Sequence, residues 1–159
     1  MEDFSLYIQR AGEDTAKGTV EEWYCGVTDA CAAVDGGFKD FASKSWQGED
    51  GEDVYIPATP RLAAYDAEWE LCYKGPGRAA FATLEAMRSW LSGKLLVLYD
   101  PYTGMGRRGA WLKGFSSPKY TRRKGAEVLR FTLTFRITAP GGGVTATEEG
   151  GKVKLTEKS

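Results

Sequence analysis

Residues 128–138, with the sequence Val-Leu-Arg-Phe-Thr-Leu-Thr-Phe-Arg-Ile-Thr, carry the clearest structural signal in this chain. Large apolar residues alternate with arginine or threonine along most of the stretch. Successive side chains of a β-strand point to opposite faces, so this alternation predicts a strand with one buried face and one exposed face. The side chains expected to enter the core are Leu129, Phe131, Leu133, Phe135 and Ile137.

Two further segments predict strands of the same sheet, and one predicts a helix. Residues 67–73 alternate as the first stretch does, and residues 95–99 form a continuous apolar run, which is typical of a buried strand. Residues 78–92 are rich in alanine and carry larger apolar side chains at helical spacing. We therefore expect a helix there, and Gly93 is a natural residue to end it.

Shorter segments complete the predicted fold. We expect strands at Phe4–Ile8, Thr19–Cys25 and Gly109–Phe115, with a loop over Gln9–Gly18 after the first of them. The resulting order is several strands, one helix and three strands, which indicates an α+β, mainly β fold. We predict an antiparallel β-barrel or sandwich with one packed α-helix at about residues 78–92.

The domain organisation follows from length and composition. A chain of 159 residues with 42% apolar residues is typical of one globular domain, which we expect to span residues 1–140. Pro140 and the glycines after it would end the last strong strand. Residues 141–159 are then expected to be a flexible polar appendage or at most a weak hairpin. The longest apolar runs are too short to cross a bilayer, so we expect no membrane contact.

The absence of histidine limits the chemistry that this chain can perform. Nucleophiles activated by histidine and the common histidine-containing zinc sites are excluded. The cysteines Cys25, Cys31 and Cys72 form no CxxC pair, and their odd number argues against a closed disulfide framework. We predict a protein that is not an enzyme and has no cofactor or metal. The alternative is a metal-dependent enzyme that uses carboxylates, although the polar face of a strand is the simpler explanation for Glu68 and Glu70.

Residues 36–60 form a long stretch rich in turn residues, and its middle is strongly acidic. The carboxylates do not follow the spacing of an EF-hand calcium loop, so we predict a loop that is solvated or faces a partner. A brief strand at Val54–Ile56 and an extended arm near Tyr55–Pro60 would follow. The candidate interface residues in this stretch are Glu49, Asp50, Glu52, Asp53, Val54, Tyr55 and Ile56.

A basic loop is expected over residues 119–125. Such cations can bind phosphates, but the chain has 21 basic and 22 acidic residues, so nucleic acid is not the favoured ligand. An acidic loop and a basic loop in one chain favour a head-to-tail contact between copies. We therefore predict a homo-oligomer, and the basic candidates at its interface are Lys119, Arg122, Arg123 and Lys124.

Several of these segments together resemble the tail proteins of long-tailed bacteriophages, most nearly the N-terminal domain of distal tail proteins. There a helix leads into a strand and a tight turn, and a later alternating strand closes the β unit. The resemblance covers about residues 40–140. The segments that carry it are Leu84–Gly93, Leu95–Tyr99 with the turn Asp100–Gly104, Phe131–Ile137 with Ala139-Pro140, and Trp46–Pro57 upstream.

The resemblance implies a structural subunit of a phage or prophage tail, made in the bacterial cytoplasm and placed in the virion tail. Such subunits form a ring, typically of six copies, around a channel that passes DNA as non-specific cargo, and they contact other phage tail proteins. Distal tail proteins usually carry a second, often sugar-binding, domain for which this chain is too short, which leaves open a tail-tube subunit, a tail terminator or another tail-completion protein. The alternative function is a non-catalytic module that binds protein or carbohydrate through exposed aromatics such as Trp46 and Tyr102.

Overall fold

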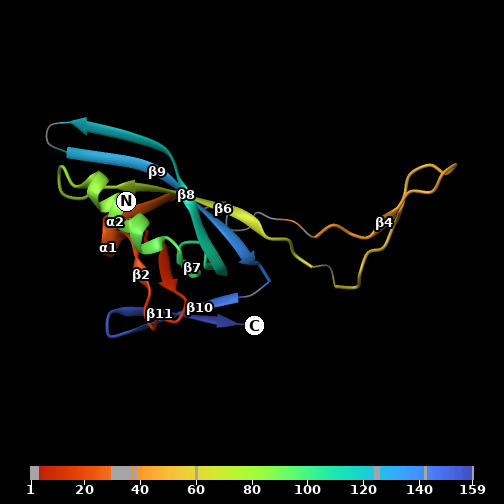
Figure 1. The fold of residues 1–159 in the computed structure, drawn as a ribbon. Coiled ribbons are helices and arrows are strands. Elements are labelled where there is room, and N and C mark those ends of the chain that lie inside the picture. The colour runs from red at the N-terminus through yellow and green to blue at the C-terminus, as the bar shows by residue number, and fades with distance from the viewer. Residues whose placement is uncertain are drawn as a thin grey trace.

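The computed structural model describes residues 4–29, 37, 39–59, 61–123, 126–141 and 143–158. Their largest unit is a seven-stranded antiparallel sheet (Figure 1). Among the described residues, no helix is both long enough and apolar enough to span a bilayer. The strands are β1 (Tyr7–Arg10), β2 (Lys17–Gly18), β3 (Cys25–Asp29), β4 (Ser43–Lys44), β5 (Asp53–Val54), β6 (Tyr65–Tyr73), β7 (Leu96–Asp100), β8 (Met105–Arg123), β9 (Ala126–Ala139), β10 (Gly143–Glu149) and β11 (Lys152–Lys158), and the helices are α1 (Thr19–Trp23) and α2 (Ala80–Leu91).

The alternating stretch 128–138 belongs to β9, which lies between β8 and β6 in the strand order β2-β1-β7-β8-β9-β6-β3. Leu133 of β9 is opposite Trp69 on β6 and Phe115 on β8. Edge-to-face aromatic contacts join Trp69 to Phe135 at 5.7 Å and Phe115 to Phe131 at 5.5 Å between ring centroids. The predicted core set is buried: Leu129, Phe131, Leu133, Phe135 and Ile137.

The predicted helix is also confirmed. Helix α2 buries Ala80, Met87 and Leu91 in the same core as the sheet, because these residues share one side of the helix. The chain leaves the helix through Gly93, which has a φ of 73° that favours glycine.

The sheet closes on itself. Phe4, which precedes β1, forms an antiparallel bridge with Val27 of β3, and the Val27 N–H donates to the Phe4 carbonyl at 2.8 Å. Since β3 is one edge strand and β1 lies beside the other, this bridge joins the two sides of the sheet. The structure confirms the α+β, mainly β prediction with an antiparallel sheet, and the bridge favours a barrel over an open sandwich.

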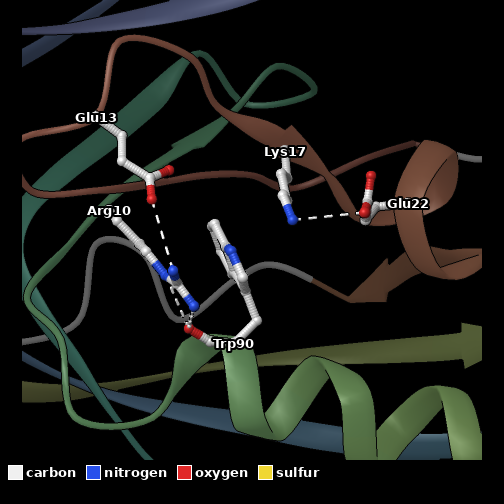
Figure 2. A network of polar contacts seen from close by, with 5 residues as sticks. All are labelled: Arg10, Glu13, Lys17, Glu22 and Trp90. Atoms are coloured by element: carbon white, nitrogen blue, oxygen red, sulfur yellow. Dashed lines mark hydrogen bonds and ion pairs between the residues drawn. The ribbon is translucent and has the colours of Figure 1, made fainter.

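Figure 2 shows the side chains that fasten the end of α2 to the first two strands. Arg10 on β1 donates from Nε and Nη2 to the carbonyl of Trp90 at 3.1 and 2.7 Å, and its guanidinium lies 4.5 Å from the Trp90 ring centroid. The ammonium of Lys17 lies 4.7 Å from the same centroid. Glu13 and Glu22 pair with these two cations at 3.6 and 3.5 Å. The network satisfies a carbonyl at the helix end and joins the helix to the sheet.

The prediction of a strand at Thr19–Cys25 is wrong for most of that segment, which forms α1 before β3 begins at its last residue. The reason is a set of tertiary hydrogen bonds. Thr19 donates its N–H to the Leu6 carbonyl at 3.1 Å and accepts the Leu6 N–H on its hydroxyl at 3.1 Å. The hydroxyl of Ser5 accepts the N–H of Val20 at 3.1 Å, as an N-cap residue would. These bonds outweigh the strand propensity of the local sequence.

Residues 141–159 were expected to be a flexible appendage or at most a weak hairpin, and the described part of this segment is a hairpin. Residues 143–158 form the β10–β11 hairpin, which packs on the barrel. Leu155 is buried, and the side-chain amide of Gln9 accepts its N–H at 2.8 Å and donates to its carbonyl at 3.2 Å. Gly106 leaves room for Val144, because a Cβ at Gly106 would lie 2.5 Å from the Val144 Cβ. Gln9, expected in a loop, lies on β1 and provides the docking point.

Candidate subunit interface

The described residues between β3 and β6 form an arm that projects away from the barrel (Figure 1), and we call residues 37, 39–59 and 61–63 the arm. Its two sides run antiparallel. The Lys39 N–H donates to the Arg61 carbonyl at 2.8 Å near the base, and the Tyr55 N–H donates to the Ala42 carbonyl at 2.8 Å further out. Strands β4 and β5 pair beyond that point. The arm is therefore a hydrogen-bonded ribbon, and its second strand begins one residue earlier than predicted, at Asp53 rather than Val54.

The tip of the arm is ordered by one acidic and one basic side chain. The indole N–H of Trp46 donates to Asp53 Oδ2 at 2.9 Å, and the ammonium of Lys44 lies 3.8 Å from the Trp46 ring centroid. Asp53 is therefore bound within its own arm. The other three acidic candidates, Glu49, Asp50 and Glu52, are exposed, and the described part of the chain offers them no ion-pair partner.

The apolar candidates on the arm are among the most exposed large side chains of the described residues. The exposed fractions are 44% for Val54, 70% for Tyr55 and 64% for Ile56. Three consecutive apolar residues of this exposure are unusual on a ribbon that has no core of its own to cover them. The structure therefore presents a short apolar strip next to three carboxylates that have no ion-pair partner among the described residues.

The basic residues predicted as a loop lie instead on a strand. Strand β8 continues to Arg123, well beyond the predicted Gly109–Phe115, so residues 119–123 are extended and paired with β9. Lys124 and the side chain of Arg123 lie outside the described residues. The strand conformation separates Lys119 from Arg122, because successive residues point to opposite faces and these two are three positions apart. Lys119 is opposite Arg130, whereas Arg122 is opposite Glu127 on the helix-covered face.

A small hollow lies beside Lys119, and we call it the β8–β9 hollow. It sits where β8 shifts register between Ser116 and Lys119, and Ser117 there has a φ of 51°, which is rare for a residue other than glycine. Arg130 was not among the predicted site residues, because on sequence it was only one polar residue of an alternating strand. The hollow is lined by Glu70, Ser117, Lys119, Arg130, Phe131 and Thr132.

The acidic tip and the basic strand ends lie at opposite ends of the molecule. In Figure 1 the arm leaves the barrel on one side, whereas the far ends of β8 and β9, where Arg123 and Ala126 pair, lie on the other. The arm of one copy therefore points away from its own Lys119 and Arg130.

Exposed aromatic side chains provide two further surface features. Phe81 of α2 and Tyr120 of β8 are both exposed and have ring centroids 5.3 Å apart. Tyr102, a candidate of the alternative binding-module function, is 69% exposed and lies 4.6 Å from the ring of Phe4. Trp46, the other such candidate, has its indole N–H bound to the arm itself.

Two carboxylates of strand β6, those of Asp66 and Glu70, have hydrogen-bond partners within the chain. Lys113 Nζ and Arg136 Nη1 lie 2.8 and 3.1 Å from the carboxylate of Asp66, and these two hydrogen bonds lower the pKa of Asp66 below its ordinary value. Glu70 Oε1 accepts the hydroxyl of Thr28 at 3.0 Å.

The two cysteines in the described residues, Cys25 and Cys72, are buried and reduced. Burial, and secondarily the neighbouring Cys72, raises the pKa of Cys25 to about 12, so its thiolate is disfavoured. Within the described residues, no three histidine, cysteine or carboxylate side chains converge in a way that could hold a metal ion.

Comparison with models of known protein families finds no match, and comparison with curated protein sequences finds none either.

Proposed function

We propose that this protein is a structural subunit of a bacteriophage or prophage tail, and that it assembles into a ring of six copies around a channel that passes DNA. The observation that carries the proposal is the arm with its exposed strip Val54–Ile56. A projecting ribbon with an apolar surface is suited to binding another chain, because its own domain does not cover that surface. The resemblance of residues 40–140 to tail proteins indicates that the assembly is a ring.

Apolar and charged residues have different roles in the proposed contact. Full burial of a side chain such as valine, isoleucine or leucine contributes about 1.5–3 kcal/mol, and Val54, Tyr55 and Ile56 each have a large part of their surface left to bury. An exposed ion pair contributes only about 0–1 kcal/mol and is screened by salt. We therefore expect the apolar strip to provide affinity and the charges to orient the subunits.

The position of the arm favours a head-to-tail arrangement. Because the arm projects from the end of the molecule opposite the basic ends of β8 and β9, one copy can offer its arm to a second copy and receive the arm of a third. Contacts between different surfaces of identical subunits generate closed rings when the rotation closes. A ring of this kind is what the resemblance to tail proteins implies.

Size-exclusion chromatography with light scattering tests the proposal over a range of protein concentrations. We expect a species with six times the 17.4 kDa mass of one chain, and negative-stain electron microscopy should show rings. Ile56→Ser should shift the equilibrium to smaller species, because it removes apolar surface from the arm. Leu95→Ser is the matched control, since Leu95 is similarly exposed at 54% but lies outside the arm, and it should assemble as the wild type does.

Two results would contradict the proposal. A chain that remains monomeric at every concentration and ionic strength would rule out ring assembly and favour a binding module for another partner. Equal loss of assembly in Ile56→Ser and Leu95→Ser would show that the arm has no special part in the contact.

A further inference from the structure

We infer that the β8–β9 hollow is the site that receives the acidic tip of the arm from a neighbouring copy. The inference rests on the proposed assembly and names the two surfaces that meet. On one side are the cations Lys119 and Arg130, and on the other are the exposed carboxylates Glu49, Asp50 and Glu52.

The hollow brings two like charges together without compensation. Lys119 and Arg130 are directly opposite each other in the β8–β9 register. Like charges at directly opposed positions destabilise a strand pair. Within the described residues, neither side chain has an ion-pair partner. Glu70 also lines the hollow, but one carboxylate against two cations leaves an excess of positive charge. An acidic group from outside the chain would relieve the repulsion.

Cations elsewhere on the same face of the sheet show the contrast. Lys113 of β8 and Arg136 of β9 share the carboxylate of Asp66. Each of these two cations therefore has an ion-pair partner within the chain, the single carboxylate of Asp66 on β6. Lys119 and Arg130 occupy the same two strands but have no such carboxylate among the described ion pairs. The difference marks this pair as the part of the sheet left for an external anion.

The shape of both surfaces suits the contact. The register shift at Ser117 interrupts the regular ladder and opens the hollow beside Lys119. At the arm tip, Gly48 and Gly51 have φ values of 86° and 78°, and no described atom comes within 4 Å of where a Cβ would stand on either residue, so the turn is unobstructed. Between the Lys39–Arg61 hydrogen bond and this turn, the arm spans at most about 30 Å, which is roughly the diameter of a small domain. If fully extended, an arm of this length would reach an adjacent copy.

Charge reversal on each surface tests the inference. The acceptor variant Lys119→Glu/Arg130→Glu has two acidic surfaces, and the arm variant Glu49→Lys/Asp50→Lys has two basic surfaces. Each alone should require about tenfold more protein for half-assembly than the wild type, because repulsion replaces attraction. An equimolar mixture should assemble again, since acidic arms then meet basic hollows and basic arms meet acidic hollows in an alternating ring. The chain that carries all four substitutions should also assemble.

Salt provides a second readout. Screening weakens attraction and repulsion alike, so added salt should reduce the charge contribution in the wild type and should favour assembly in the two variants. The matched control is Lys94→Glu/Lys152→Glu, which makes the same change of charge at two exposed lysines outside the hollow. This control should assemble with the concentration dependence of the wild type. Circular dichroism and thermal melts of every variant check that it is folded.

The outcomes separate this inference from the proposed function. Wild-type rings together with unaltered assembly of the acceptor variant would overturn the inference and leave the proposed ring intact. Loss of assembly that neither the mixture nor the fourfold variant restores would also overturn the pairing of these surfaces. A wild type that never assembles would overturn both proposals. Duplex DNA retained by the wild type and lost by the acceptor variant, with assembly unchanged, would assign the hollow to nucleic acid instead.

Discussion

The buried carboxylate of Glu127 is expected to hold helix α2 on the sheet. Glu127 lies on β9 with only 6% of its surface exposed. Its Oε1 accepts the N–H of Ala80 at 3.1 Å, and its Oε2 accepts the N–H of Arg78. Ala79, the residue at the N-cap position, has no side-chain acceptor of its own. A strand distant in sequence therefore caps the helix.

The loss of stability on removing this carboxylate can be derived from the two backbone N–H groups that it accepts. Loss of an N-cap side chain costs about 0.5–2 kcal/mol, and a hydrogen bond to a charged group contributes about 1.5–3 kcal/mol. These quantities overlap, because both describe the same backbone donors. We expect Glu127→Ala to lower the free energy of unfolding by about 2–4 kcal/mol, or the melting temperature by roughly 5–15 °C in a chain of this size. Glu127→Gln keeps one acceptor oxygen and should lose about half as much.

Urea denaturation followed by circular dichroism measures the effect. Glu85→Ala is the control, because Glu85 is an exposed glutamate of the same helix whose only described contact is a surface pair with Arg88 at 3.6 Å. Its free energy of unfolding should stay within about 0.5 kcal/mol of the wild type. If Glu127→Ala unfolds at the same urea concentration as Glu85→Ala, the carboxylate does not stabilise the helix and the reasoning is refuted.

Three further predictions concern the core, the thiols and acid stability. Phe131→Ala should cost about 3–5 kcal/mol in urea denaturation, and an unchanged midpoint would contradict the burial of that ring. In a Cys31→Ser background, the buried Cys25 and Cys72 should not react with Ellman's reagent at neutral pH until urea unfolds the chain, whereas fast labelling of the native protein would show that they are accessible. Ion pairing lowers the pKa of Asp66 below the ordinary 3.8, so its contribution to stability is present above that pH and is lost as the pH falls through the lowered value. Asp66→Asn should therefore reduce stability at neutral pH, and its difference from the wild type should disappear in strong acid; a difference that persists there would contradict the ion-pair explanation.

The elements predicted correctly from sequence are those whose signal is local. Strands β9 and β6 have alternating sequences, and helix α2 has apolar residues at helical spacing. In each element the pattern itself predicts one buried face. Helix α1 was not predicted, and the C-terminal hairpin was expected only as an alternative to a flexible appendage, because distant residues determine both. Ser5 and Leu6 fix the start of α1, and Gln9 docks the hairpin through Leu155. No local window of sequence contains those partners.

The candidate interface likewise has one part that could be predicted from local sequence and one part that could not. The arm could be predicted from composition, because turn residues, carboxylates and an apolar strip are adjacent in the chain. The basic surface could not, because its geometry depends on register. The shift between Ser116 and Lys119 decides which side chains of β8 point outward, and it pairs Lys119 with Arg130 while Arg122 points to the opposite face. Lys119 and Arg122, which are close in sequence, therefore do not share one surface.

The direction of the arm also bears on how many copies would assemble. Contact between the arm and the β8–β9 hollow is compatible with two arrangements: a reciprocal pair, in which two copies exchange arms, and a head-to-tail series. In a reciprocal pair each arm must lie back along the side of the partner barrel, and assembly stops at two copies. In Figure 1 the arm instead continues outward from its barrel, beyond the end of its own copy. In the proposed head-to-tail assembly, such an arm would meet a copy that lies beyond it and would leave its own hollow free for the next arm, so the series would continue until the rotation between neighbours closes it. This is why the mass of the wild-type oligomer, six chains rather than two, is the measurement on which the tail-ring proposal depends.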